Sequence, residues 1–296
     1  MMNFFSKLNK LILFSLLLAF TTGVIAETTL KRKVAVARFS NETQSGTTFL
    51  VDDSGDRIGK QASDILSSRL AATGKFLMFE RTDKDEIDSE KIISGLKNEG
   101  VGVEYLIIGS VSEFGRSSES ESQVFRRTKS QRAFAKVNVR LVDVSTGRII
   151  YSEEGAGESV NSAESRAFSK VRTGYDQSLT DKAISAAIST LVSNLVENMT
   201  NKPWKSYILS KEDGLYIIAG GEKQGIQIGS KLIVYQKGKT IKNPQSGAMI
   251  ELPGKKVGTI SIESSFGDDE FSEISFATLD DGELSDDFSN YYISDK

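Results

Sequence analysis

The clearest alternation of apolar and polar residues in the chain lies between Ala133 and Val144. The apolar positions of this stretch, which share one side of an extended backbone, are Ala133, Ala135, Val137, Val139 and Leu141. Lys136, Asn138 and Arg140 fall on the other side. A period of two residues predicts a β-strand with one buried face. The turn residues Ser145-Thr146-Gly147 and the stretch RIIYSEEGAG follow directly, so a hairpin is predicted here.

Strand and helix patterns alternate through the first part of the chain. Short apolar runs predict strands at 33–39, 75–81 and 104–114. Helices are predicted at 56–74, 88–100 and 181–199, and the first and last of these have apolar residues at spacings of three or four. The resulting order, β-α-β-α-β-β-β-α, predicts an α/β domain in which helices flank a mixed sheet.

The pattern changes at Asn201-Lys202-Pro203. Beyond it, five short apolar runs are separated by glycine, Asn-Pro and Asp-Gly turns: GLYIIAGG, GSKLIVYQKG, KKVGTISIESS, EISFATL and NYYIS. This spacing predicts a small all-β barrel of the SH3-like kind. We therefore divide the chain into an α/β domain at 27–200 and a barrel domain at 201–296, with Trp204 near the linker that joins them.

The N-terminus has the pattern of a secretory signal peptide. Lys7 and Lys10 precede an apolar run from Leu11 to Phe20, and small residues then lead to a cleavage site between Ala26 and Glu27. A retained membrane anchor is the alternative, although the apolar run is short for a transmembrane helix. No later segment is long and apolar enough to span a bilayer as a helix.

The composition excludes several classes of function. The chain has 39% hydrophobic and 26% charged residues and a net charge of -3, which does not favour nucleic-acid binding. It contains no histidine and no cysteine. Catalysis by Ser-His-Asp or Cys-His, the usual zinc sites, disulfides and a lipidated cysteine are therefore excluded. We predict a protein that is not an enzyme and needs no cofactor or metal.

Three other motifs favour plain structural interpretations. The stretch GDRIGKQ (55–61) resembles a phosphate loop, but its glycines are one residue too close and no Ser or Thr follows Lys60, so we predict the first turn of a helix. The basic residues Arg126, Arg127, Lys129 and Arg132 are suited to a phosphate or an acidic partner, but they face the acidic run 119–121 along the chain, which favours pairing across a hairpin at least as strongly. The acidic segment 268–287 matches no calcium-binding loop and is predicted to be a solvated face.

Four stretches of the first domain resemble the family of the curli production assembly/transport component CsgG. They are KVAVARFSNET (33–43), GKQASDILSSRLAATGKFLMFER (59–81), EYLIIGSVSEF (104–114) and VNVRLVDVSTGRIIYSE (137–153). The stretches LYIIAGGEKQGIQIGSKLIVYQKG and KKVGTISI of the second domain resemble the small C-terminal barrel of flagellar assembly protein T. Typical curli channels lack such a barrel.

The resemblance implies a periplasm-facing envelope protein that assembles as a homo-oligomeric ring. In the best-known family member each protomer contributes two hairpins to a secretion pore, and these would correspond to about Gly115–Ala135 and Glu153–Asp176 here. Within them, the candidate residues for a membrane or partner contact are Arg116, Phe125, Arg127, Ala163, Val171 and Tyr175. The cysteine that is lipidated in the family is absent.

The residues of these two regions argue against a membrane pore. A membrane strand needs an apolar outward face over ~9–11 residues. Between Arg116 and Arg132 both faces carry charge. Between Gly155 and Tyr175 the odd positions are uncharged, but they are small and polar. We therefore favour solvated segments, a flexible hairpin in the first region and an extended ribbon or short helix in the second.

The sequence thus predicts an exported cell-envelope assembly or secretion component that acts in the periplasm as a non-catalytic oligomeric scaffold. Its expected partners are further copies of itself and envelope or secreted proteins, with an outer-membrane association left open. The alternative is an outer-membrane curli-type secretion channel formed by a ring of protomers.

Overall fold

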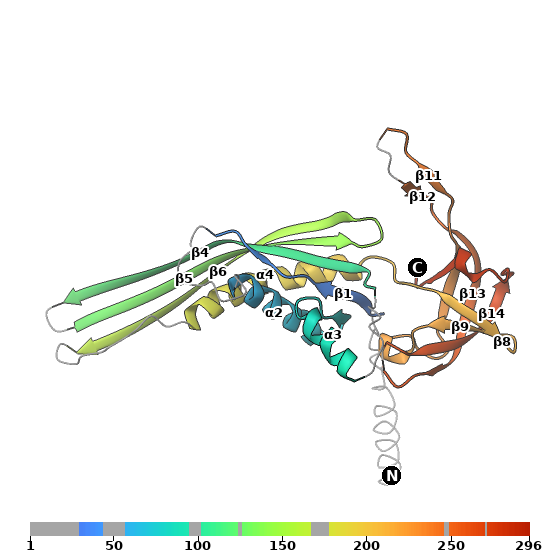
Figure 1. The fold of residues 1–296 in the computed structure, drawn as a ribbon, viewed down its shortest axis with the longest axis horizontal. Coiled ribbons are helices and arrows are strands. Elements are labelled where there is room, and N and C mark those ends of the chain that lie inside the picture. Colours follow the sequence, from blue (N-terminus) through green and yellow to red (C-terminus); the bar gives the residue numbers. More distant parts are fainter. Residues whose placement is uncertain are drawn as a thin grey trace, which may run out of the picture.

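The structure, a computed structural model, describes residues 30–43, 57–94, 102–123, 126–166, 178–245, 249–269 and 271–296. Within these ranges the side chains at 90, 120–129 and 163–166 are not described. Two sheets dominate the described residues. Figure 1 shows the first sheet with its helices on the left and in the centre, and the second sheet on the right.

The first sheet is mixed and has the strand order β3-β1-β4-β5-β6, with β2 paired to β4 beside this path. Its strands are β1 (Arg32–Val36), β2 (Ser40–Asn41), β3 (Phe76–Phe79), β4 (Tyr105–Gln123), β5 (Arg126–Asp143) and β6 (Arg148–Arg166). The pairs of β1 with β3 and β4 are parallel, and the pairs among β4, β5 and β6 are antiparallel. The predicted α/β class with a mixed sheet is confirmed.

Two helices, α2 (Arg57–Ala72) and α4 (Ser178–Thr200), pack on one face of this sheet. Their buried stripes include Leu66, Leu70, Ile184, Ile188, Leu191 and Leu195. These side chains form one core together with the apolar face of β5 that the alternation predicts, from Ala133 to Leu141. Burying each large aliphatic side chain contributes about 1.5–3 kcal/mol, so this layer is the main source of stability of the first sheet. On the opposite face, Arg140, Ser152 and Glu154 are exposed.

Helix α3 (Lys84–Ile93) begins four residues before the helix predicted at 88–100. Asp85 and Glu86 lie in its first turn, where acidic side chains interact favourably with the helix dipole. Lys84 pairs with Asp88 one turn later. The rest of the predicted helix, from residue 95, lies outside the described residues.

The three antiparallel strands of the first sheet extend well beyond the predicted ones. β4 continues past Phe114 to Gln123, β5 begins at Arg126 rather than at Ala133, and β6 continues to Arg166. The added length is rich in serine and charge, and it has no apolar period that could reveal a strand. Cross-strand pairing continues from Gly115↔Phe134 to Gln123↔Arg126, so backbone hydrogen bonds hold these residues extended.

The second sheet is antiparallel and nearly closed, with the order β7-β15-β10-β13-β14-β9-β8. Its strands are β7 (Lys205–Ser206), β8 (Ile208–Glu212), β9 (Leu215–Ala219), β10 (Lys231–Gln236), β13 (Lys255–Phe266), β14 (Ile274–Gly282) and β15 (Tyr291–Ser294). The segment 205–212 closes the sheet, because β7 pairs with β15 and β8 pairs with β9. Trp204, Ile218, Val234, Ile260 and Ile293 are buried inside. A barrel-like sheet is confirmed, and its SH3-like subtype stays a prediction.

Four strands of this region were not predicted. β7 and β8 lie in a stretch where serine and lysine interrupt the apolar residues. β11 (Thr240–Lys242) and β12 (Met249–Glu251) form a separate two-stranded hairpin whose residues are all exposed. Because no face of this hairpin is buried, its sequence carries no alternating pattern.

The two sheets are in direct contact. The backbone N–H of Lys31, just before β1, donates a hydrogen bond to the carbonyl oxygen of Gln224 over 2.8 Å. Leu30 packs against the core of the second sheet. The rings of Phe79, at the end of β3, and Phe271 meet edge to face with centroids 5.0 Å apart. The first sheet and its arm-like extension are therefore tied to the barrel at the end of β3 and the start of β1.

Candidate functional site, a three-stranded arm

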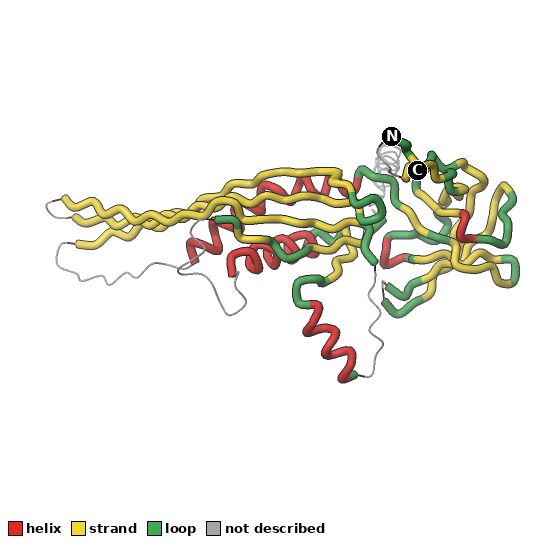
Figure 2. The backbone as a smooth tube through the Cα atoms, turned by 45° about the horizontal axis from the view of Figure 1, so that its top comes forward, coloured by secondary structure: helices red, strands yellow, loops and turns green. Residues whose placement is uncertain are grey.

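The long strands of the first sheet project beyond its helices as a three-stranded ribbon, which we call the arm. It comprises residues 113–123, 126–136 and 156–166, the parts of β4, β5 and β6 that pair outward from Glu113↔Lys136↔Ala156. Figure 1 shows the arm reaching to the left of the molecule, and Figure 2 shows its three strands running side by side with no helix along their outer part.

One face of the arm is buried only at its base. Phe114, Ala133 and Ala135 belong to the core under α4. The guanidinium group of Arg116 lies over the ring of Phe114, 5.1 Å from its centroid, and donates a 2.7 Å hydrogen bond to Oγ1 of Thr180. Gln131 is the outermost residue of this face that is described as buried. Arg116 therefore marks where the apolar core gives way to the polar part of the arm.

The opposite face of the arm carries charges that are paired across strands. Nζ of Lys136 on β5 lies 2.7 Å from Oε1 of Glu113 on β4, and this hydrogen bond raises the pKa of Lys136. Nε of Arg132 on β5 lies 3.0 Å from Oε1 of Glu158 on β6. These ion pairs link the central strand to both neighbours. Each is solvent-exposed, so each contributes little to stability by itself.

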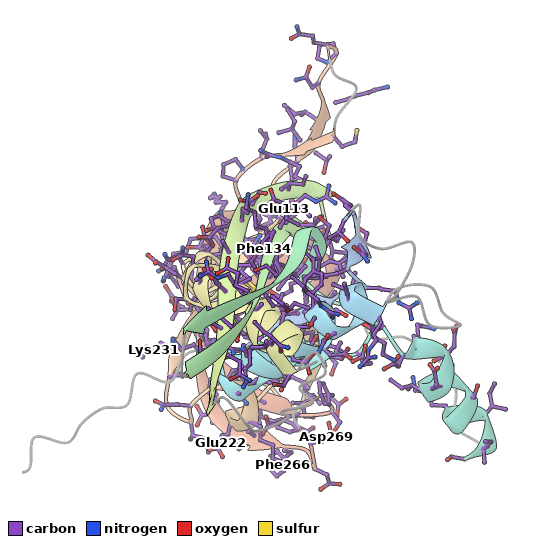
Figure 3. All side chains as sticks on the ribbon, turned by 90° about the vertical axis from the view of Figure 1, so that its left-hand side faces the viewer. Glu113, Phe134, Glu222, Lys231, Phe266 and Asp269 are labelled. Carbon is purple, nitrogen blue, oxygen red and sulfur yellow. The ribbon has the colours of Figure 1, made fainter. Side chains whose placement is uncertain are left out.

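A single aromatic side chain interrupts this charged face. The ring of Phe134 lies across Gly115, which is its cross-strand partner, and a Cβ at Gly115 would stand only 2.1 Å from that ring. Figure 3 shows Phe134 and Glu113 on the outer surface of the sheet. A ring that covers a strand glycine compensates for the side chain that glycine lacks.

Both outer edges of the arm are unpaired within the described chain. β1 pairs with β4 only as far as Ile107, and β2 pairs only at Ser110 and Val111. From Ser112 outward, no described strand pairs with the outer side of β4. Along its whole length β6 pairs only with β5 among the described strands. Long unpaired strand edges are templates for pairing with another chain, and proteins commonly cover them.

The base of the arm is held in place by very close packing against α4. A Cβ on Gly157 would stand 2.2 Å from the backbone nitrogen of Ala187 and 2.3 Å from the carbonyl oxygen of Ala183. Gly155 lies equally close to the same helix. Glycine inside a strand can indicate such a backbone approach, so the sequence Gly155-Ala156-Gly157 held a signal that the sequence analysis missed.

A second set of contacts fixes α4 itself. Arg69, in the last turn of α2, donates 2.6 Å hydrogen bonds to Oγ of Ser189 and Oγ of Ser185. The amide of Asn194 donates to Oε1 of Glu153 on β6 over 2.7 Å, and the hydroxyl of Tyr151 donates to Oε2 of the same carboxylate. Burial and the Glu153 carboxylate together raise the pKa of Tyr151. The direction of the arm is thus set by two helices and the sheet.

The structure places the predicted hairpin regions in one ribbon. The region Gly115–Ala135 forms a hairpin of β4 and β5, as expected. The described part of the second region, residues 153–166, is the third strand of the same ribbon, which agrees with the extended alternative and not with a short helix. The remainder of that region lies outside the described residues.

The structure describes only some of the individual candidate residues. Arg116 lies at the base of the arm, as described above. Arg127 and Ala163 lie in β5 and β6, where Arg127 pairs with Ser165 and Lys129 with Ala163, but their side chains are not described. Phe125, Val171, Tyr175 and the cleavage-site residues Ala26 and Glu27 lie outside the described residues.

The remaining sequence motifs have structural roles. Residues 57–61 form the first turn of α2, as predicted, and Nζ of Lys60 lies 2.9 Å from Oδ1 of Asp83. In the acidic C-terminal segment, Asp280 pairs with Lys231 at 2.9 Å, and Asp287 accepts hydrogen bonds from Ser289 and Asn290. Across the described residues no cluster of three or more Asp or Glu side chains could hold a metal ion, and no helix is long and apolar enough to cross a membrane.

Comparison with known proteins points to one family. The model of the family "Curli production assembly/transport component CsgG" matches residues 19–228. A curated protein of Neisseria meningitidis serogroup B, named "Putative lipoprotein NMB1126/NMB1164", is 35% identical over 178 residues, which is 58% of this chain and 78% of that protein.

Two solved structures are similar to part of this chain. A dodecamer of PelC from Paraburkholderia phytofirmans is 20% identical, with a TM-score of 0.30 over 56% of this chain and 89% of that one. Lipoprotein GNA1162 from Neisseria meningitidis is 15% identical, with a TM-score of 0.26 over 58% of this chain and 99% of that one. At these TM-scores we draw no conclusion from either structure.

Proposed function

The chain belongs to the family of the curli production assembly/transport component CsgG, and from this membership we propose that it is an exported, non-catalytic scaffold that assembles as a homo-oligomer in the periplasm. Its role would be in the assembly of the cell envelope or in secretion, with envelope or secreted proteins as partners. The division into domains at 27–200 and 201–296, and the SH3-like nature of the second, are part of this proposal.

The observation that carries the proposal is the arm with its two outer strand edges. β4 and β6 are 19 residues long each, and among the described strands none pairs with the outer side of either in the outer half of the ribbon. The β4 edge of one copy can pair with the β6 edge of the next, and each added copy presents the same pair of edges again. Such a head-to-tail contact gives a closed ring when its rotation closes.

The packing at the base of the arm supports the same function. Because Gly155 and Gly157 bring β6 against the backbone of α4, the arm leaves the body in one direction. A rigid arm loses little conformational entropy on assembly, which favours association through its edges.

Shortening the arm tests the proposal. In the first variant an Asn-Gly turn replaces residues 117–132, so that Arg116 and Ala133 remain the last paired positions of β4 and β5. This variant should keep its helical circular dichroism but lose self-association, measured by light scattering after size exclusion in aqueous buffer. In the matched control, Arg132→Ala with Glu158→Ala, both edges remain and assembly should persist. Unchanged assembly of the shortened chain would overturn the proposal.

A second function, an outer-membrane secretion channel formed by a ring of protomers, is favoured by the length of the arm. Its strands provide the ~9–11 residues that a membrane strand needs. The charges of Arg132 and Glu158 on one face and of Arg116 on the other disfavour it, since a lipid-facing Arg or Lys near the bilayer midplane costs about 2–4 kcal/mol. Release of the mature protein by osmotic shock without detergent would support the scaffold, and recovery only in detergent would support the channel.

A further inference from the structure

The hairpin of β11 and β12 is the second projecting feature of the molecule. It rises from the barrel between β10 and β13, and Figure 1 shows it standing clear of the rest of the chain at the top of the view. Its three paired positions are Thr240↔Glu251, Ile241↔Ile250 and Lys242↔Met249. An isolated two-stranded hairpin is at best marginally stable in water, so a surface that covers it would stabilise it.

One face of this hairpin is apolar and solvent-exposed. Ile241 and Ile250 lie directly opposite each other, and their side chains are 48% and 43% exposed. Leu252, two positions beyond Ile250 on the same face, is also exposed. Three neighbouring aliphatic side chains at the end of a projection form a compact apolar contact surface.

Four lysines lie on the hairpin or next to its base. Lys239, whose carbonyl oxygen accepts from the N–H of Leu252, shares the face of Ile241, Lys242 lies on the opposite face beside Met249, and Lys255 and Lys256 begin β13. The one acidic residue of the hairpin strands is Glu251. No ion pair joins any of these four lysines to an acidic residue within the described chain, whereas Lys231 and Lys136 elsewhere are paired. The hairpin therefore combines an apolar centre with a positive rim, and the chemistry that complements it is apolar and negative.

A surface with this complementary chemistry lies at the other end of the same barrel. Phe266, 58% exposed, and Phe271, 49% exposed, lie on either side of the exposed acidic residues Asp268 and Asp269. The carboxylate of Asp269 accepts hydrogen bonds from the backbone N–H groups of Phe271 and Ser272 at 2.7 and 2.8 Å, which holds the loop in shape and lowers the pKa of Asp269.

One lysine lies close to this acidic loop. Nζ of Lys223 contacts the carbonyl oxygens of Gly267 and Asp268 at 3.2 and 2.7 Å. Its charge offsets part of the negative charge of Asp268 and Asp269, and Glu222 beside it adds a further exposed carboxylate. The loop end of the barrel thus keeps a negative character.

The hairpin cannot reach this loop within one molecule. β13 starts three residues after β12, at Lys255, and ends at Phe266, so the hairpin base and the loop lie at opposite ends of a 12-residue strand. At ~3.3 Å per residue that separation is roughly 36 Å. Figure 3 shows the hairpin at the top of the molecule and Phe266 and Asp269 at the bottom.

We propose that the β11–β12 hairpin of one copy docks on the Phe266–Phe271 loop of a second copy, with the aliphatic face of Ile241, Ile250 and Leu252 against the exposed phenylalanines and the lysines around the acidic positions. The contact uses two different surfaces of the same chain, so every copy in an assembly can both give and receive a hairpin. This inference rests on the proposed homo-oligomer and assigns it a second contact, in the barrel rather than in the arm.

Engineered cysteines test the contact directly, because the natural chain has none. Full-length chains with Ile241→Cys and with Asp268→Cys are mixed and oxidised. A disulfide-linked dimer should form between the two variants and not within either variant alone. In the control mixture, Ile241→Cys is paired with Leu209→Cys, which is equally exposed but lies on β8 outside both surfaces. Absence of the specific dimer, or an equal yield in the control, overturns the proposal.

Charge exchange provides the quantitative test. Lys239→Glu, on the same face of the hairpin as Ile241, and Asp268→Lys should each weaken self-association by about tenfold, and a chain with both changes should recover most of the loss. Met249→Ser, on the opposite face of the hairpin from Ile241, is the matched control and should leave association unchanged.

The outcomes separate this contact from the arm. If the shortened arm abolishes assembly while Lys239→Glu and Asp268→Lys have no effect, the hairpin contact is wrong and the proposed function stands. If the wild-type chain is a monomer at high concentration, the proposed function itself fails.

Discussion

Gly157 is a position where a single methyl group would clash with the backbone of α4. Its Cα lies so close to α4 that an added Cβ meets two backbone atoms of the helix, at Ala187 and Ala183, and neither can move alone. An alanine gains roughly 0.4–1 kcal/mol from a less flexible unfolded chain, but overpacking against a fixed neighbour costs about 1–3 kcal/mol. The steric effect is the larger of the two.

We therefore expect Gly157→Ala to lower the free energy of unfolding by about 1–2 kcal/mol. Urea unfolding followed by circular dichroism measures this change. Ala156→Ser, one residue earlier on the exposed face of β6, is the control and should stay within about 0.5 kcal/mol of the wild type. Equal stability of Gly157→Ala and the wild type would show that α4 does not pack this closely.

Glu104, just before β4, should make stability depend on pH. Burial raises the pKa of its carboxyl group, and the backbone N–H of Lys33, which donates to Oε1 at 3.1 Å, and the charge of Arg32 oppose this rise only in part. The folded state thus binds a proton more tightly than the unfolded state. The contribution of Glu104 to stability is then largest at low pH and falls as the pH rises from about 4.3, the ordinary glutamate value, through the higher folded-state pKa.

The variant Glu104→Gln isolates this effect. A glutamine keeps an oxygen that can accept the hydrogen bond from Lys33 but does not ionise. Relative to the wild type, the variant should gain stability progressively as the pH is raised from 4 to 7, in urea titrations at several pH values. A difference between the two proteins that is the same at every pH would rule out a raised pKa at Glu104.

At the scale of elements, the sequence predicts those strands that bury one face. The alternation from Ala133 to Leu141 fixes the inner half of β5, because each apolar side chain there meets α4 or α2. The outer half, from Arg126 to Arg132, has no apolar face, since its strand structure depends on pairing with β4 and β6 and not on burial. β11 and β12 were not predicted for the same reason, because neither strand buries a face.

The candidate site was predictable to a similar degree. The resemblance to the CsgG family placed the first hairpin where β4 and β5 pair, and the described part of the second region is the third strand of the same ribbon. Glycines within a strand suggest that another backbone comes close to Gly157. The sequence does not indicate that this backbone belongs to α4. The covering of Gly115 by Phe134 depends on the register of β4 and β5, which a bulge between Val111 and Glu113 shifts by one residue.

Phe134 is expected to hold β4 and β5 together at the base of the arm. Its ring covers Gly115 across the strand pair, so Phe134→Ala removes a cross-strand contact that contributes about 0.5–1 kcal/mol. We expect faster hydrogen exchange at the backbone amides of residues 115–119, with little change in the helices. Lys136→Ala, which removes only an exposed ion pair two residues away, is the control. Unchanged exchange in Phe134→Ala would contradict this role.

At the scale of the whole molecule, the two proposed contacts are geometrically compatible. In Figure 1 the long axis of the molecule is horizontal, the β11–β12 hairpin points up, and the β4 and β6 edges at the tip of the arm face up and down. The Phe266–Phe271 loop lies at the bottom of the barrel (Figure 3). In an assembly whose copies keep parallel long axes, the contact from hairpin to loop brings the β4 edge of one arm towards the β6 edge of the next.

Such an assembly requires the barrel and the first sheet of each copy to keep one relative orientation. Two described contacts serve this purpose, the hydrogen bond from Lys31 to Gln224 and the ring contact between Phe79 and Phe271. An edge-to-face aromatic pair contributes about 0.5–1.5 kcal/mol beyond its buried area. Phe271→Ala should therefore weaken the coupling between the two sheets without changing the core of either.

Two signals can follow the sheets separately in that variant. Trp204, the only tryptophan of the chain, is buried in the core of the second sheet, so its fluorescence reports the barrel. Helical circular dichroism reports α2 and α4, which cover the first sheet. In the wild type we expect the two urea transitions to coincide, as a cooperative unit requires. In Phe271→Ala we expect them to separate.

Phe266→Ala is the control. It loses a ring contact with Phe276 inside the barrel alone and should shift the fluorescence transition. If the two signals still coincide in Phe271→Ala, the orientation of the sheets does not depend on this ring contact.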